Sequence, residues 1–215
     1  MTPRILSCLP AWALADLDEA VAHVKKGGLI VIPTDTVYGI GALASNSDAV
    51  AALLAAKGRG PSMPPPVLVD SPQALDRLAV DVPEPARRLA WAAWPGGLTL
   101  IVRARPELGW NLGRNGGTVA LRMPDHAQVL ELIARSGPLA VSSANLTGAP
   151  PATSIEEAIA SFPDSVLHID SGPTPGSTPS TILDFAHGDA SVIRLGTLSL
   201  EELSEAAGVT LMGAE

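Results

Sequence analysis

The chain has 215 residues, which is enough to bury a core of its own and typical of one domain or two small ones. Hydrophobic residues make up 47% and charged residues 17%, which excludes a disordered or fibrous protein, and no apolar run approaches the ~18 residues that cross a bilayer. The net charge of -8 argues against a protein whose main task is to coat nucleic acid.

The cysteine content and the first residues indicate the compartment. Cys8 is the single cysteine, so an internal disulfide framework is excluded. Pro10 interrupts the apolar stretch near the N-terminus and acidic residues follow it, so no signal peptide is predicted. We therefore expect a cytoplasmic protein that does not associate with membranes.

Apolar spacing and turn residues predict helices and strands that alternate along the chain. In chain order they are a helix from residue 14 that stops at 27–28, a strand over 29–32, a helix over 47–57, a strand over 67–69, a helix near 85–94, strands over 98–103 and 118–122, a helix over 128–135, a strand over 139–142, a helix near 155–162, strands over 166–169, 181–185 and 191–195, and a helix near 200–207. This alternation predicts an α/β fold, and the closely spaced later strands predict antiparallel pairs within a mixed sheet. Without a repeat or a long linker, residues 1–215 are expected to form a single domain.

Three stretches between these elements are predicted to be loops. Residues 33–39 are too polar and turn-rich for a buried strand and are expected to be exposed and ordered. Residues 58–66 hold two glycines and four prolines, and residues 171–180 hold two glycines and three prolines. Structureless loops as long as 171–180 are uncommon in a compact domain unless they are functional or disordered, so this segment is expected to be either a mobile lid over a ligand site or a passive surface connection.

Common nucleotide and hydrolase motifs are weak or absent. Gly39, Gly41 and Ala44 match the dinucleotide fingerprint G-x-G-x-x-A, but the predicted strand ends well before the first glycine and no acidic residue follows at the expected distance. Glycines that allow close packing are the interpretation we favour. The chain has no P-loop and no G-x-S-x-G motif, and its four histidines are dispersed, so a zinc site built by the protein is not expected.

Several polar residues stand where α/β proteins bind anions. Lys57 and Arg59 extend from a helix end into a glycine-rich loop, where they could clamp a polyphosphate; alternatively, the lysine complements the helix dipole. Residues 142–145, Ser-Ser-Ala-Asn, follow a strand and form either a ligand-binding edge or a plain turn. Arg122 and Arg194 end strands, either to bind a carboxylate and a phosphate or as solvated edge residues.

Six short motifs follow one another along the chain. They are Pro-Thr-Asp-Thr-Val-Tyr-Gly at 33–39, Lys-Gly-Arg at 57–59, Trp-Pro-Gly-Gly-Leu-Thr at 94–99, Arg-Met-Pro at 122–124, Ser-Ser-Ala-Asn-Leu-Thr-Gly at 142–148 and Pro-Ser-Thr-Ile at 179–182. Together, from about residue 14 to 202, they resemble the YrdC-like family of L-threonylcarbamoyladenylate synthases. The resemblance implies an open twisted sheet flanked by helices, and a reaction that condenses L-threonine, bicarbonate or CO2, and ATP to threonylcarbamoyl-AMP and pyrophosphate. A separate complex would use the product to modify tRNA.

The resemblance also implies site residues. It places ATP against Lys57, Arg59, Thr118, Ser143, Asn145 and Arg194, and threonine against Thr36, Arg122 and Ser180. Lys57 and Arg59 are implied to neutralise phosphate charge during catalysis, with Mg²⁺ carried by the nucleotide and no metal ligand in the protein. Both are expected on a loop outside the core, so that replacing them should lower turnover more than stability. Met63 and Leu68 depart from the family pattern, which often has a polar residue and a histidine there.

Two other functions compete with this interpretation. A related carbamoyltransferase would adenylate carbamate itself, although such proteins usually have much longer chains. An RNA-binding module could hold a tRNA on a concave face with Arg59, Arg122 and Arg194, but the net charge of -8 opposes a broad basic surface.

Overall fold

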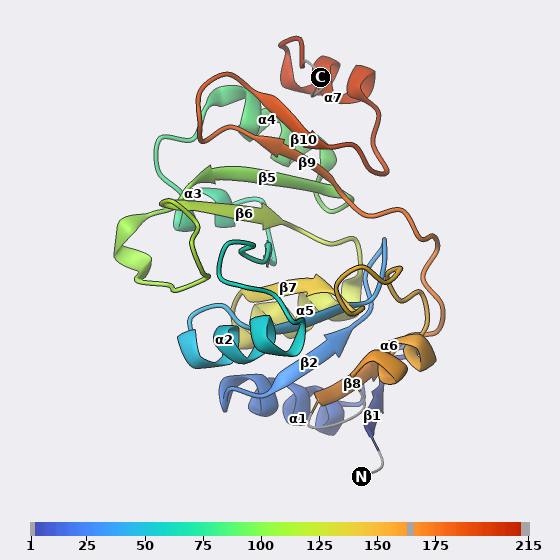
Figure 1. The fold of residues 1–215 in the computed structure, drawn as a ribbon. Coiled ribbons are helices and arrows are strands. Elements are labelled where there is room, and N and C mark those ends of the chain that lie inside the picture. Colours follow the sequence, from blue (N-terminus) through green and yellow to red (C-terminus); the bar gives the residue numbers. More distant parts are fainter. Residues whose placement is uncertain (1–2, 163–165, 212–215) are drawn as a thin grey trace.

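The computed structural model describes residues 3–162 and 166–211, so parts of the expected domain, residues 1–2, 163–165 and 212–215, lie outside the described residues (Figure 1). In chain order the elements are β1 (Arg4–Ser7), α1 (Leu14–Lys25), β2 (Leu29–Ile32), β3 (Gly39–Leu43), α2 (Ser47–Ala56), β4 (Val67–Leu68), α3 (Ala74–Leu78), α4 (Glu84–Ala93), β5 (Leu98–Arg103), a 3-10 turn (Pro106–Leu108), β6 (Thr118–Arg122), α5 (Ala127–Ser136), β7 (Leu139–Ser143), α6 (Ile155–Ser161), β8 (Val166–Asp170), β9 (Thr181–Asp184), β10 (Ser191–Arg194) and α7 (Leu200–Ala207). Every predicted helix and strand is present, and β1, β3 and α3 are additional.

The strands form one mixed sheet. Within the described residues its order is β1-β8-β2-β3-β7-β4-β6-β5-β9-β10. Strands β1, β8 and β2 are parallel to one another, as are β4 with β6 and β5 with β9. The other neighbours are antiparallel, including the closely spaced pairs β5–β6 and β9–β10. The predicted α/β fold with a mixed sheet is therefore confirmed.

Helices cover the sheet because its strands are apolar on both faces. In β2, Ile30 and Ile32 pack in one buried cluster with residues of α1 and α5, whereas Val31 packs in the other cluster with residues of α2 and α4. This alternation is the two-residue period of a strand. In Figure 1, α1 lies near the end of the sheet that holds β1, β8 and β2, α5 lies beside β7, and α4 and α7 lie near β9 and β10.

Strand β3 was not predicted, and its glycines explain its position. Gly39 and Gly41 lie in the middle of the sheet, between β2 and β7, and both are buried. A Cβ atom on Gly39 would meet Val141 Cγ1 at 2.5 Å, and one on Gly41 would meet Val141 Cγ2 at 2.8 Å. The G-x-G-x-x-A sequence is thus part of an antiparallel strand and not a turn before a helix, and close packing is the correct interpretation.

Residues 33–39 are buried, so the expectation that they are exposed is wrong. Thr34 accounts for this, because its Oγ1 donates to the carbonyl oxygen of Val37 at 2.7 Å and accepts the amide N–H groups of Thr36 and Val37, each at 3.2 Å. A polar turn that satisfies its own hydrogen bonds can be buried at little cost. Only Asp35 in this stretch is partly exposed.

Two features place the functional site. Strand β4 contributes only two residues between β7 and β6, so beyond it the two halves of the sheet are no longer hydrogen-bonded to each other. The segment 171–180, orange in Figure 1, runs along one side of the molecule from β8 to β9 and so links these halves.

Among the described helices, none is both long enough and apolar enough to cross a membrane.

Candidate active site

A cavity of about 540 Å³ lies between the two halves of the sheet. Residues from both halves line it, and they include eight of the nine predicted site residues: Thr36, Arg59, Thr118, Arg122, Ser143, Asn145, Ser180 and Arg194. Lys57 is the exception. The lining holds three arginines and, among the described residues, no carboxylate. Its chemistry therefore suits anions.

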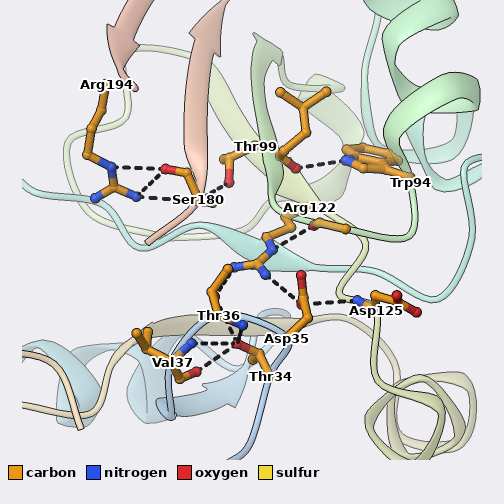
Figure 2. A network of polar contacts seen from close by, with 12 residues as sticks. Thr34, Asp35, Thr36, Val37, Trp94, Thr99, Arg122, Asp125, Ser180 and Arg194 are labelled. Atoms are coloured by element: carbon orange, nitrogen blue, oxygen red, sulfur yellow. Dashed lines mark hydrogen bonds and ion pairs between the residues drawn. The ribbon is translucent and has the colours of Figure 1, made fainter. Parts of the chain in front are cut away.

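Arg122 is the centre of a buried network at one end of the cavity (Figure 2). It is the last residue of β6, and its side chain is 8% exposed. Its Nη2 donates to Asp35 at 2.6 Å, its Nη1 to Thr36 Oγ1 at 2.9 Å and its Nε to the carbonyl oxygen of Gly96 at 3.0 Å. Burial lowers the pKa of Arg122, and the charge and hydrogen bond of Asp35 oppose that shift. Asp35 also accepts the amide N–H of Asp125 at 3.0 Å.

Ser180, just before β9, is the second group at this end. Its hydroxyl is 2.9 Å from Thr99 Oγ1 and accepts from Arg194 Nη2 at 3.2 Å (Figure 2). Arg194 also donates twice to the carbonyl oxygen of Ser180, at 3.0 and 2.8 Å. The register between β9 and β10 shifts between Val192 and Arg194, and such an irregularity redirects a side chain at the edge of a sheet. Burial first, and the charge of Arg122 second, lower the pKa of Arg194.

The opposite end of the cavity is lined by Arg59 from the loop after α2, Thr118 at the start of β6 and Ser143 at the end of β7. Arg59 Nη1 donates to Ser142 Oγ at 2.9 Å, and Arg59 Nε is buried without a partner in the described part of the chain. Thr118 Oγ1 donates to the carbonyl oxygen of Asn115 at 2.6 Å, and Asn115 Nδ2 donates back to that of Thr118 at 2.8 Å. Arg59 thus keeps donors available for a ligand.

Lys57 is not on an exposed loop, so that expectation is wrong. It caps the C-terminal end of α2, and its side chain is 1% exposed. Its Nζ donates to the carbonyl oxygens of Ser143 and Asn145 and not to those of its own helix. Burial, followed by the charge of Arg59, lowers the pKa of Lys57 to about 8. The two roles predicted for this residue, complementing the helix dipole and clamping a phosphate, stay predictions.

Sequence reasoning assigned no role to three polar residues at the site. Asp35 and Thr99 lie within quoted motifs, where their polarity in otherwise buried surroundings was an available signal. Asn115 lies in a glycine-rich loop and offered none. The two residues that depart from the family pattern, Met63 and Leu68, both line the cavity. Met63 is half-exposed, and Leu68 is buried. No group of three or more His, Cys, Asp or Glu that could hold a metal ion is present among the described residues.

Comparison with known proteins shows similar sequences along most of the chain. A family model described as telomere recombination, which covers the Sua5, YciO and YrdC proteins, matches residues 22–196. A Mycobacterium tuberculosis protein is 48% identical over 192 residues, 89% of this chain and 88% of that one. The threonylcarbamoyl-AMP synthase of Bacillus subtilis is 37% identical over 193 residues, 88% of this chain and 56% of that one.

Solved structures are also similar to this chain along most of its length. Pyrococcus abyssi Sua5 complexed with L-threonine has a TM-score of 0.88 at 33% identity, over 97% of this chain and 62% of that one. Escherichia coli YciO, at 22% identity and a TM-score of 0.83, shares the fold. The chain therefore belongs to the Sua5/YciO/YrdC family.

Proposed function

We propose that this chain is a nucleotidyltransferase that condenses L-threonine, bicarbonate or CO2, and ATP to threonylcarbamoyl-AMP and pyrophosphate. The observation that carries the proposal is the cavity itself, in which Arg59, Arg122 and Arg194 face one space without a carboxylate among the described residues. ATP and bicarbonate are anions, and threonine carries a carboxylate. The names of relatives support it, because the Bacillus subtilis and Pyrococcus abyssi proteins are called threonylcarbamoyl-AMP synthase.

The buried end of the cavity suits the amino acid. Arg122 has five N–H donors, and three of them are used by Asp35, Thr36 and Gly96, one from each nitrogen. One donor therefore remains on Nη1 and one on Nη2, which matches the two oxygens of a carboxylate. Ser180 and Thr36 add hydroxyl groups beside it. A Pyrococcus abyssi Sua5 structure that holds L-threonine supports this assignment.

The other end suits the nucleotide. Arg59, Thr118 and Ser143 line it, and Arg194 lies on the amino-acid side, where a phosphate chain would meet the second substrate. With no carboxylate among the described lining residues, the protein offers no ligand set for Mg²⁺, which prefers such oxygens. We infer that the ion is held by the phosphate oxygens, where it would neutralise charge.

The reaction needs no covalent intermediate with the protein. The threonine amine adds to CO2 and loses a proton, which forms a carbamate. A carbamate oxygen then attacks the α-phosphorus of ATP, the bond from that phosphorus to the bridging oxygen breaks, and pyrophosphate leaves with the electron pair. The contribution of the cavity is to position the two substrates and to neutralise phosphate charge with Arg59 and Arg194. The product would serve tRNA threonylcarbamoyladenosine formation by a separate complex in the cytoplasm.

Pyrophosphate release tests the proposal. Purified protein with ATP, Mg²⁺ and bicarbonate should release pyrophosphate when L-threonine is supplied and not without it. L-serine lacks one methyl group and should be used about 10- to 200-fold less well. Equal release without any amino acid, or with carbamoyl phosphate alone, would instead indicate a carbamoyltransferase. Tight tRNA binding in a filter assay without pyrophosphate release would indicate an RNA-binding module.

A matched pair of variants locates the activity. Arg59→Met removes a cavity arginine and should lower kcat/KM by about 10²- to 10³-fold, because it deletes one preorganised donor to the phosphates. Arg103→Met removes an arginine at the end of β5 that is 63% exposed and pairs with Asp81 on the surface. It should leave the rate unchanged. Equal rates for both variants would contradict the placement of the site.

A further inference from the structure

The three donors of the Lys57 ammonium group are directed at the last residue of β7 and at the loop that follows it. Its Nζ donates to the carbonyl oxygen of Ser143 at 2.5 Å and to that of Asn145, and it lies 3.5 Å from Asn145 Oδ1. The Phe162 ring lies beside it, with its centroid 5.9 Å from Nζ. An ammonium group has three N–H donors, so none remains for a phosphate oxygen while these contacts hold.

The side chain of Asn145 is engaged in the same way. Its Nδ2 donates to the carbonyl oxygens of Leu146 at 2.9 Å and Ala149 at 2.7 Å, which uses both amide donors. Thr147 Oγ1 donates to the carbonyl oxygen of Lys57 at 2.8 Å. The loop and the end of α2 therefore each donate a hydrogen bond to the other. Residues 144–149 are neither helix nor strand, and these side-chain contacts therefore hold their backbone.

Other polar residues of these two motifs line the cavity together with Asn145. Arg59 lies two residues after Lys57, lines the cavity and contacts Ser142. Ser143 also lines it, and its hydroxyl makes no hydrogen bond within the described part of the chain. Within residues 57–59 and 142–145, Lys57 is thus the charged residue that does not line the cavity, whereas Arg59, Ser143 and Asn145 do.

We propose that Lys57 is a positioning residue: together with Asn145 it holds the backbone of the 143–149 loop so that Ser143 faces the nucleotide, and it does not contact the nucleotide itself. This proposal rests on the proposed function of the cavity. It differs from the role implied by the family resemblance, in which Lys57 neutralises phosphate charge directly.

A double-mutant cycle tests the coupling that the proposal requires. Ser143→Ala should lower kcat/KM for ATP by about 10²-fold in the wild-type background. In the Lys57→Met background the same substitution should lower it by about threefold or less, because the loop no longer presents the hydroxyl. In the Arg59→Met background, the control cycle, Ser143→Ala should keep its full effect. A full effect in the Lys57→Met background, or none in the wild type, would overturn the proposal.

Chemical labelling of the wild-type protein gives a second test that does not depend on folding of a variant. The chain has only three lysines, and Lys25 and Lys26 are exposed at the end of α1, so they are internal references. With an amine-acetylating reagent at pH 7, read by mass spectrometry, Lys57 should react at least about tenfold more slowly than the two references. Its lowered pKa gives it more neutral amine than an ordinary lysine, so slow labelling would report burial and not charge.

Labelling of Lys57 with and without bound nucleotide distinguishes a positioning residue from a nucleotide ligand. A saturating non-hydrolysable ATP analogue should leave the rate at Lys57 unchanged. Fast labelling of Lys57 in the free protein, followed by protection on adding the analogue, would make it a nucleotide ligand and refute the proposal. Failure of the proposed function is recognised separately, as absence of threonine-dependent pyrophosphate release by the wild type, and the labelling result does not depend on that activity.

Discussion

Replacing Asp35 by alanine removes the carboxylate that faces the buried guanidinium group of Arg122. The two side chains are 17% and 8% exposed, and the contact is 2.6 Å long. Removing one partner of a buried ion pair destabilises a protein by about 3 to 5 kcal/mol, because the other charge stays buried. Arg122 keeps its contacts with Gly96 and Thr36, so we expect the lower part of that range, about 3 to 4 kcal/mol. The midpoint of thermal unfolding should fall by roughly 6 to 16 °C in a chain of this size.

The assay is urea unfolding at pH 7, followed by threonine binding. Asp35→Asn keeps the shape and one acceptor oxygen, and it should lose about half as much stability as Asp35→Ala. The control is Glu19→Ala, which breaks the exposed pair between Glu19 and Arg4 and should leave the midpoint nearly unchanged.

The same substitution should act on one substrate only. Because Asp35 orients the guanidinium group that faces the amino acid, Asp35→Ala should raise KM for threonine and leave KM for ATP nearly unchanged. A loss of stability below about 1 kcal/mol would show that water reaches the Arg122 guanidinium group, and the reasoning from a buried pair would then be wrong.

Three further predictions concern other parts of the site. The pKa of Lys57 is about 8 in the folded chain, whereas an ordinary lysine has a pKa of 10.5, so the unfolded chain binds more protons between these pH values. Denaturant unfolding should therefore show stability rising across that window by up to about 3 kcal/mol more in the wild type than in Lys57→Met, and equal pH profiles would contradict the shift. Gly113 has a φ of +102°, and a Cβ atom there would lie 2.6 Å from the carbonyl oxygen of Pro61. Gly113→Ala should therefore lower the free energy of unfolding by about 1 to 3 kcal/mol in the same assay and weaken ATP binding. Unchanged stability and binding would show that the loops of Gly113 and Pro61 can separate freely. Residues 175–178 are exposed, and hydrogen exchange there should slow when threonine and a non-hydrolysable ATP analogue bind together; unchanged exchange would make the loop a passive connection.

Local sequence patterns determined most of the elements but not all of them. Every predicted helix and strand is present, because the spacing of apolar residues directly reflects which side of an element is buried. The β1 strand (Arg4–Ser7) was missed because it is short, and its pairing partner, β8, lies more than 150 residues later. The β3 strand was missed because Gly39 and Gly41 weaken the strand pattern, and only the packing of Val141 against them shows why they are needed.

The sequence also identified residues of the site but not their depth in the structure. Motif resemblance named eight residues that line one cavity, although they come from segments between Thr36 and Arg194. Nothing in the local pattern could show that Lys57 is buried, since a lysine at a helix end is ordinarily solvated. Its burial follows from the carbonyl oxygens of Ser143 and Asn145, which the tertiary structure brings to it from the end of β7 and the loop after it, 86 and 88 residues away. A buried charge is stable only where such distant groups compensate it, and that arrangement is set by the assembled sheet and not by the neighbours of a residue in the chain.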